Sequence, residues 1–335
     1  MDTSYPQQDL EIPRDLLTQR ISATLIRAGV KAQAAEATAE ILIEGSARGY
    51  ALHGVERLLH ILEGLQRGTI SPAAEATVVR ETSAVAIIDA RCGLGPPQGK
   101  RAMELAVQKA IHGGIGVVGV INGSHLGALA YYSEIASSQG CVGLTLSTSS
   151  PAVVVKGGQR KTFGTNPISY SIPQTPFPIT ADFATSKVSR GKICDYQQKG
   201  LSLPSGWAVD RQGVGTNDPS EALAGGLQTL DGDIKGSLIS LLVSVLAGPL
   251  IGGVINPAVK GTRYMDSSPN KGDLFFAFHV ETFTCPSLFI QEMGQLSSFI
   301  TQQNVEFRIP GARHQRDSAQ HKIKISPLLA QALEV

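Results

Sequence analysis

The stretch IHGGIGVVGV, residues 111–120, decides how the fold is interpreted, because its glycines have the spacing of a dinucleotide-binding turn. Gly114, Gly116 and Gly119 form G-x-G-x-x-G, a motif that a strand should enter and a helix should leave. Here the order is reversed, since RAMELAVQKAI before it has helical apolar spacing and IGVVGVIN after it is β-branched. We therefore predict a helix capped by Gly113 and Gly114, then a strand, and not a phosphate-binding turn.

On both sides of this stretch, strand-like and helical patterns alternate, which predicts an α/β fold. The predicted strands are 77–81, 84–90, 115–121, 141–147, 178–183 and 273–280, and the predicted helices are 98–112, 127–139 and 285–303. The middle segment 184–232 is rich in Gly, Pro, Asp and Ser, so we expect it to be irregular.

The first seventy residues instead carry three helical patterns, at 13–29, 32–49 and 55–68. The chain thus divides into a helical cluster over 1–75, an α/β core over 76–310, and a basic segment with a helix over 311–335. The helical preface and the irregular middle do not fit a standard doubly wound order.

Composition limits the possible partners of the protein. The 335 residues carry a formal net charge of +1, which gives no global field that would attract nucleic acid or an anionic membrane. Charged residues make up only 17%, and we expect part of the surface to be covered by oligomer contacts. The four scattered cysteines, without any C-x-x-C, predict neither a zinc site nor a disulfide framework and fit a reducing cytoplasm.

No segment has the pattern of a signal peptide or a membrane span. The N-terminus is acidic and polar where a signal peptide is basic and apolar. The most apolar run, 238–255, is interrupted by serines, glycines and a proline, so we predict a buried helix that ends near Gly248 in a soluble protein.

Two histidines stand at positions suited to catalysis. His53 lies in a short loop between two helices, with Arg57 in the first turn of the second helix, and could supply an acid/base beside a carboxylate clamp. His125 follows a predicted strand at the entry to a helix, where ligands of α/β sheets bind. The alternatives are a surface histidine with a solvated arginine, and a histidine that caps the helix.

Three further segments have polar groups that could contact a ligand. Thr165 lies in the rigid turn GTNP, and Asp182 ends a strand before small residues. Lys235 begins a long apolar helix, where a cation is unfavourable unless a bound anion compensates it, or unless Asp231 and Asp233 pair with it. The histidines lack the spacing of a metal site, and no metal is expected.

Seven segments, in this order, resemble the malate/L-lactate dehydrogenase type of NAD(P)-dependent oxidoreductase, over about residues 13 to 325. That family includes ureidoglycolate and sulfolactate dehydrogenases and reductases of cyclic imines. The segments are ARGYALHGVER, NGSHLGALAYYSEIA, GGQRKTFGTNP, DFATSKVSRGKI, LPSGWAVDRQGVGTNDP, IKGSLISLLVSVLAG and IPGAR.

The resemblance implies a homodimer that binds NAD or NADP on a non-Rossmann, mixed-sheet α/β core, and a small carboxylate substrate. His53 matches the acid/base, His125 a second catalytic or cofactor-contacting histidine, and Arg57 and Thr165 substrate contacts. The positions that match cofactor contacts are His125, Leu126, Gly127, Ala128, Leu129, Ser149, Asp182, Phe183, Ala184, Lys235, Gly311, Ala312 and Arg313.

Three departures from the family pattern bear on the substrate and the cofactor. Leu52 replaces a serine common in the family, and GDIKG, with the acidic Asp231 and Asp233 beside the lysine, replaces G-G-x-K-G. Lys192 replaces an aspartate of imine reductases and favours 2-hydroxy acids, whereas EALAGG and LAGPLIGG resemble the imine-reductase branch. The expected reaction is hydride transfer between NAD(P)H and a 2-oxo or 2-hydroxy acid. The alternatives are reduction of a cyclic 2-imino acid, or nucleotide binding without catalysis.

Overall fold

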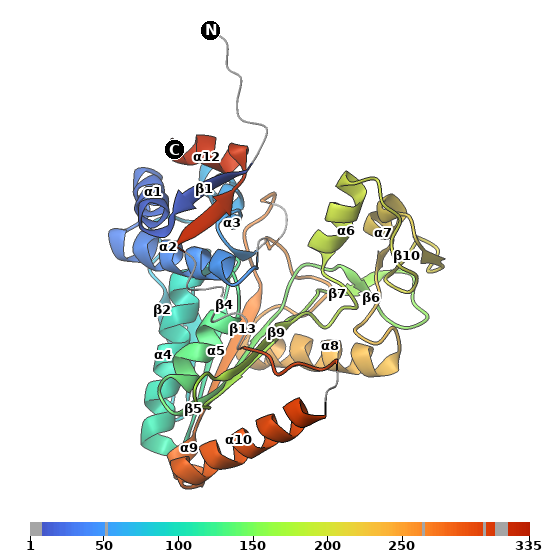
Figure 1. The fold of residues 1–335 in the computed structure, drawn as a ribbon. Coiled ribbons are helices and arrows are strands. Elements are labelled where there is room, and N and C mark those ends of the chain that lie inside the picture. Colours follow the sequence, from blue (N-terminus) through green and yellow to red (C-terminus); the bar gives the residue numbers. More distant parts are fainter. Residues whose placement is uncertain (1–8, 51–52, 263–264, 304–305, 312–320) are drawn as a thin grey trace.

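The centre of the protein is a seven-stranded mixed sheet in the order β2-β3-β4-β13-β5-β8-β9 (Figure 1). The computed structural model describes residues 9–50, 53–262, 265–303, 306–311 and 321–335. In this sheet β3 and β4 are parallel and every other neighbouring pair is antiparallel. The strands are β2 (Thr77–Glu81), β3 (Val85–Asp89), β4 (Ile115–Ile121), β13 (Gly272–His279), β5 (Cys141–Ser147), β8 (Ile168–Ile172) and β9 (Ile179–Phe183). The predicted α/β class is confirmed.

The glycine-rich stretch has the helix-then-strand order that its sequence predicts. Helix α4 (Gly95–Gly113) ends at Gly114, which has φ +86° and leads directly into β4. Gly116 lets α4 lie close to the strand, because a Cβ there would stand 1.9 Å from the carbonyl oxygen of Ala106. The glycines therefore serve helix capping and close packing.

Helices cover the two faces of this sheet. On one face, α4 and α5 (Ala130–Ser137) enclose a core that includes Met103, Tyr132 and Phe275. Helix α8 (Ile234–Leu246) and the short 3-10 helix η2 (Pro249–Ile251) pack on the other face. Helix α5 begins three residues later than predicted, so residues 126–129 form a loop that follows His125.

A helical layer at one end of the sheet contains both ends of the described chain (Figure 1). Helices α1 (Arg14–Arg27), α2 (Ala32–Ala47) and α3 (Arg57–Gln66) share one apolar core with the C-terminal α12 (Pro327–Leu333). Strand β1 (Leu10–Pro13) pairs antiparallel with β14 (Lys322–Ile325), which the sequence patterns did not predict. The C-terminal segment thus packs on the N-terminal helices.

A smaller lobe corrects the prediction that 184–232 is irregular. Its five-stranded sheet has the order β11-β10-β12-β6-β7, and helices α6 and α7 pack beside it (Figure 1). The strands have only two or three residues each, too few for alternation to be visible in the sequence. The elements are β6 (Val153–Val154), β7 (Lys161–Phe163), α6 (Arg190–Gln198), β10 (Ala208–Val209), β11 (Gly215–Thr216), α7 (Pro219–Ala224) and β12 (Gly226–Leu227).

Helix α8 is buried on only one side, so the prediction of a buried helix over this run is wrong for its other face. Ser240 and Ser244 point inward, fully buried, and donate hydrogen bonds to Thr185 and Asn256. The helix carries an exposed row of Ile234, Leu238, Leu241, Leu242 and Val245. By length and composition alone, Ile234–Ile251 could cross a membrane, with a mean hydropathy of 1.9.

The last two helices before the C-terminal segment follow the end of the central strand β13 (Figure 1). Helix α9 (Val280–Phe283) leads into α10 (Pro286–Gln302), as predicted for 285–303. No residue of α10 is buried, and Leu288, Leu296 and Phe299 are exposed on it.

The packing at Gly116 generates a stability prediction. Replacement Gly116→Ala should lower the free energy of unfolding by about 2 kcal/mol or more, because the methyl group collides with the backbone of α4. Gly113→Ala is the matched control, since a Cβ there meets nothing within 4 Å and alanine favours the helix. Urea denaturation measures both, and equal stability of the two variants would contradict this packing.

Candidate functional site

The two predicted catalytic histidines lie face to face. The ring centroids of His53 and His125 are 5.3 Å apart, with an interplanar angle of 16°. His53 comes from the loop between α2 and α3, and His125 from the loop after β4, so the helical layer and the sheet meet at this pair. Both side chains are half-buried. The alternatives of a free surface histidine and a helix-capping histidine are not what the structure shows.

Gly127 determines which nitrogen of His125 carries a proton. Its backbone N–H donates a 2.9 Å hydrogen bond to Nδ1 of His125, so Nδ1 is an acceptor and the neutral ring carries its proton on Nε2. Gly127 has φ +84°, and a Cβ there would stand 3.2 Å from the carbonyl oxygen of His53. A glycine at this position therefore serves both the turn and the contact between the two histidine loops.

Arg57 lies beside the histidine pair as the first residue of α3. Its guanidinium Nη2 donates a hydrogen bond to the carbonyl oxygen of Thr262. Its Nε is buried and has no hydrogen-bond partner among the described residues. Burial lowers the pKa of Arg57 to about 10. A buried donor without a partner is costly, and a bound carboxylate would satisfy it.

The same surroundings keep both imidazoles uncharged. Burial, followed by the positive charge of Arg57, lowers the pKa of His53 to about 4. The pKa of His125 is lowered well below its ordinary value by burial first, and then by Arg57, His53 and Lys271. The pair is therefore neutral at pH 7 unless a negative charge arrives beside it.

Ser149 and Thr165 meet across the ends of two segments. The N–H of Thr165 donates to Oγ of Ser149 at 3.0 Å, and the two hydroxyl oxygens are 3.3 Å apart. Asn166 holds this turn with φ +30°, and its Oδ1 accepts from the N–H of Ser149 at 3.2 Å. The side chain of Asn256 extends the network to the carbonyl of Ser149.

Thr262 connects this network to Arg57, and the sequence reasoning missed it. Its Oγ1 accepts from the N–H of Ser150 at 2.9 Å, while its carbonyl oxygen accepts from Arg57. Neither Thr262 nor Asn256 lies in a motif that sequence alone could single out. Both residues reach the site because the segment 256–262 folds back onto the end of β5, a contact between distant segments that the sequence does not show.

In the loop after His125, the main chain is accessible to a ligand but the apolar side chains are not. Leu126, Ala128 and Leu129 are each 2–3% exposed, so a ligand could contact only their main chain. Asp182, at the end of β9, accepts a 3.0 Å hydrogen bond from the N–H of Ala130 and so caps α5. If Asp182 contacts the cofactor, the same side chain therefore also caps α5.

The other predicted cofactor positions lie at the two ends of β9 or begin α8. Phe183 is 38% exposed and Ala184 partly exposed. Gly311 packs against β9, since a Cβ there would stand 2.5 Å from the carbonyl oxygen of Pro178. Ala312 and Arg313 lie outside the described residues, as does Leu52.

Lys235 is exposed and has no ion pair with a described carboxylate. Asp231 accepts from the N–H groups of Asp233 and Gly236 at 2.9 and 3.0 Å, and Asp233 accepts from Ile234. Both carboxylates thus cap α8 rather than pair with Lys235, which leaves the cation available to an anion. The departure Lys192 lies on the exposed side of α6, 3.6 Å from Asp195.

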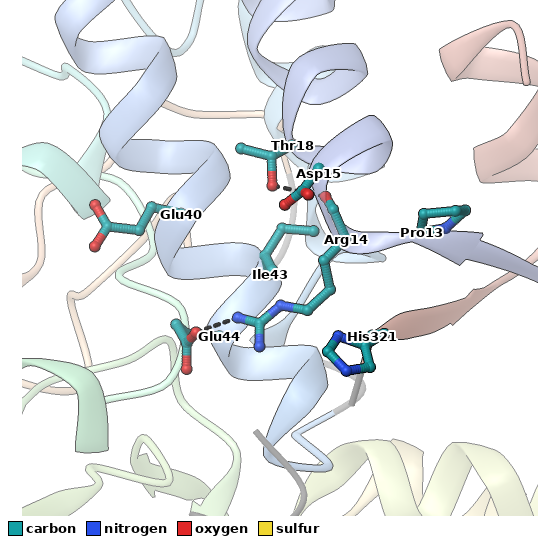
Figure 2. A pocket seen from close by; sticks show the side chains of 8 residues that line it. All are labelled: Pro13, Arg14, Asp15, Thr18, Glu40, Ile43, Glu44 and His321. Atoms are coloured by element: carbon teal, nitrogen blue, oxygen red, sulfur yellow. Dashed lines mark hydrogen bonds and ion pairs between the residues drawn. The ribbon is translucent and has the colours of Figure 1, made fainter. Parts of the chain in front are cut away.

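A separate pocket of about 500 Å³ lies in the helical layer (Figure 2). Figure 2 shows Arg14 extending toward Glu44, with which it forms an ion pair. None of the predicted site residues lines it. Within the described part of the chain, no group of three His, Cys, Asp or Glu side chains has the geometry of a metal site.

Comparisons with known proteins identify the family of this chain. A family described as malate/L-lactate dehydrogenase matches residues 12–334. The protein belongs to the malate/L-lactate dehydrogenase family. One relative, an L-sulfolactate dehydrogenase of Methanocaldococcus jannaschii, is 35% identical over 88% of this chain and 86% of its own.

A solved structure and a second kind of relative extend this comparison. The solved structure of the sulfolactate dehydrogenase from the same archaeon superimposes with a TM-score of 0.90, at 32% identity, over 97% of this chain and 95% of that one. A Δ1-pyrroline-2-carboxylate reductase of Burkholderia ambifaria is 32% identical over 76% of this chain and 75% of its own. Enzymes that act on hydroxy acids and on cyclic imines thus both resemble this chain.

The lowered pKa of His53 generates a prediction about pH and stability. Between the ordinary value of 6.5 and about 4, the unfolded chain binds a proton at His53 that the folded protein does not. The free energy of unfolding should therefore fall as the pH falls through this window. His53→Gln should reduce that slope by up to one proton, or about 1.4 kcal/mol per pH unit.

Chemical denaturation of both proteins from pH 8 to pH 4 measures the two slopes. They should coincide near pH 8, where the ring is uncharged in either state. Equal slopes between pH 6.5 and 4 would show that His53 titrates normally in the folded protein.

Proposed function

We propose that this member of the family is an oxidoreductase that transfers a hydride between NAD(P)(H) and a small 2-oxo or 2-hydroxy acid. The observation that carries this proposal is the stacked His53–His125 pair beside Arg57, whose buried Nε lacks a partner. A carboxylate beside a carbonyl is the ligand that such a guanidinium and a pair of imidazoles would orient.

Arg57 binds the substrate carboxylate and, by doing so, changes the charge that His53 experiences. In the free protein, burial and the Arg57 cation hold the pKa of His53 at about 4. A carboxylate on Arg57 offsets that cation, the second cause after burial, and its negative charge raises the pKa of His53, which favours uptake of a proton after the substrate binds. His53 then donates this proton to the carbonyl oxygen as charge develops on it, and accepts it back in the reverse direction.

His125 acts as a fixed neutral donor in this proposal. Because Gly127 occupies Nδ1, the proton on Nε2 is the one that His125 can offer to a substrate oxygen or to a cofactor group. Stacking on His53 keeps the two rings at a constant separation. The two histidines therefore have different tasks, since His53 moves a proton and His125 polarises without changing its charge.

The chain also fits a nicotinamide nucleotide. Lys235 is an exposed cation that forms no ion pair with a described carboxylate, and the partly exposed Ala184 follows the end of β9, where a ribose or ring would lie. Ser149 and the main chain of 126–129 supply further hydrogen-bonding groups. The bound cofactor supplies or accepts the hydride. We place it on this mixed sheet with one parallel strand pair, and not on a parallel Rossmann sheet.

A cyclic 2-imino acid is the second candidate substrate. The Burkholderia ambifaria relative and the segments EALAGG and LAGPLIGG favour it. An imine carboxylate would bind Arg57 in the same way, and His53 would protonate the ring nitrogen instead of an oxygen.

We propose further that the protein is a soluble homodimer of the cytoplasm. Helix α8 turns its two serines inward and its apolar row outward, and α10 exposes further apolar side chains. An apolar face of this kind marks an interface, and the resemblance implies a second copy of the chain as its partner. The four cysteines are free, which fits a reducing compartment.

Steady-state assays with NADH and NADPH test the reaction. Pyruvate and oxaloacetate should be reduced, and the reaction should reverse with the matching hydroxy acids. Turnover of Δ1-pyrroline-2-carboxylate or Δ1-piperideine-2-carboxylate alone would establish the second candidate. Binding of a nucleotide without any turnover would establish a family member that has lost catalysis.

Substitutions at the site separate its parts. His53→Gln should lower kcat by about 10²- to 10⁴-fold, the usual contribution of a positioned acid. His112→Gln is the matched control, exposed in the last turn of α4 and away from the site, and should stay within about twofold of the native kcat. Arg57→Lys should raise KM by about 10- to 100-fold, since it loses the fork that binds a carboxylate. Native activity in His53→Gln would rule out the acid assigned here.

The dimer is tested by sedimentation. The native protein should sediment as a dimer, and Leu242→Glu, which places a charge in the exposed row of α8, should sediment as a monomer. Leu201→Glu is the control, because Leu201 is similarly exposed but lies after α6 in the smaller lobe. If the native protein sediments as a monomer, the proposed dimer is wrong.

A further inference from the structure

A buried ion pair lies beneath the candidate site and has no part in the mechanism above. Lys271 and Asp273 are 2% and 0% exposed, and Nζ of Lys271 contacts both carboxylate oxygens of Asp273. Burying two charges is expensive, and replacing such a pair by apolar residues of similar size often costs no stability. Stability alone therefore gives little reason for a lysine and an aspartate at this place.

The pair stands where the two functional loops begin. Residues 271–273 enter β13, which lies between β4 and β5 in the sheet. On one side, the N–H of Asn122 donates to the carbonyl oxygen of Lys271 at 3.1 Å, three residues before His125. On the other side, Oγ of Ser147 donates to Asp273 at 2.6 Å, two residues before Ser149.

A second set of contacts ties the same loops to this point. The N–H of Gly272 donates to Oγ1 of Thr148 at 3.0 Å, and the N–H of Thr148 donates to the carbonyl oxygen of Gly272. The fully buried Tyr132, which experiences the charge of Asp273, donates from its hydroxyl to the carbonyl oxygen of Leu126. The pair is thus surrounded by groups that fix the loop of His125 and the loop of Ser149.

We propose that Lys271 and Asp273 are a positioning pair for this site, joining the ends of β4, β5 and β13 beneath the loops that carry His125 and Ser149, with the cation toward His125. This inference rests on the proposed function, since it assigns to the pair the placement of the neutral donor and of a cofactor contact. Neither residue touches substrate in this proposal. Both act through the loops above them.

The charge of Lys271 has a second effect on His125. The charged and titratable groups that act on His125 are Arg57, His53 and His60 from the helical layer, and Lys271 from β13. All of them disfavour a proton on the imidazole. The carboxylate of Asp273 interacts with Lys271, Ser147 and Tyr132. Removing the pair should therefore let His125 take up a proton at higher pH.

The double variant Lys271→Met/Asp273→Leu tests the proposal, because it removes both charges together and leaves no unpaired ion in the core. It should unfold at nearly the native temperature. Its kcat should fall by about 10- to 100-fold, the usual loss when reacting groups are displaced by about 1 Å. The titration of His125, followed by NMR of labelled histidine, should move upward in pH, because the positive charge of Lys271 is one of the causes that lower its pKa.

Two further variants keep the test decisive. Lys109→Met/Glu81→Leu removes a 2.9 Å ion pair between α4 and β2, away from the site, and should leave kcat and the His125 titration unchanged. Ser147→Ala removes the 2.6 Å hydrogen bond to Asp273, together with a longer 3.3 Å contact to the carbonyl oxygen of Thr148, and should lower kcat in the same direction by several-fold even if the double variant fails to fold.

The outcomes separate this inference from the proposed function. A folded double variant with native kcat and native His125 titration would overturn the positioning role, while loss of activity in His53→Gln would still support the reaction. If the native protein turns over none of the substrates, the NMR titration still tests the pair. An unchanged titration of His125 in the double variant would then reject the positioning role of Lys271 and Asp273.

Discussion

The constraint on which the site depends is that two neutral imidazoles and one guanidinium share a space partly closed to water. Burial makes a second positive charge beside Arg57 unfavourable, so the free protein holds His53 and His125 as neutral imidazoles, each with a single ring proton. In the function proposed above, a carboxylate bound to Arg57 offsets its charge and favours the uptake of a second proton by His53. Such an arrangement would couple binding to chemistry, because the acid would form mainly after the ligand has bound.

The fold supplies this arrangement by bringing distant segments together at one place. The helical layer brings His53 and Arg57, the loop after β4 brings His125, and the folded-back segment that ends at Thr262 holds the guanidinium. The loop that leaves β5 adds Ser149 to the same end of the sheet. Glycines at two points make the approach possible, Gly116 beneath α4 and Gly127 between the histidine loops. The chemistry is polar, but its geometry depends on close backbone packing.

Much of this was predictable from sequence where the signal is local. Long apolar periodic segments predicted α4, β4, β5, β13 and α10, and the order of elements around Gly114 showed that the glycine motif has a structural role. Motif resemblance singles out His53, Arg57 and His125, although the sequence does not show that the two histidine rings stack. What sequence could not show depends on contacts between distant segments. The two-residue strands of the smaller lobe have no visible period, Thr262 has no motif, and the outward face of α8 looks as apolar in sequence as a buried one.

The pairing of β1 with β14 has a consequence for the order in which the protein assembles during synthesis. The helical layer that carries His53 shares its core with α12, which is made long after α1, α2 and α3. Until α12 has been synthesised, the sheet can form but this layer lacks part of its apolar core. The loop of His53 and the start of α3 at Arg57 would therefore be fixed late, so a product truncated before α12 could contain most of the fold without a complete helical layer.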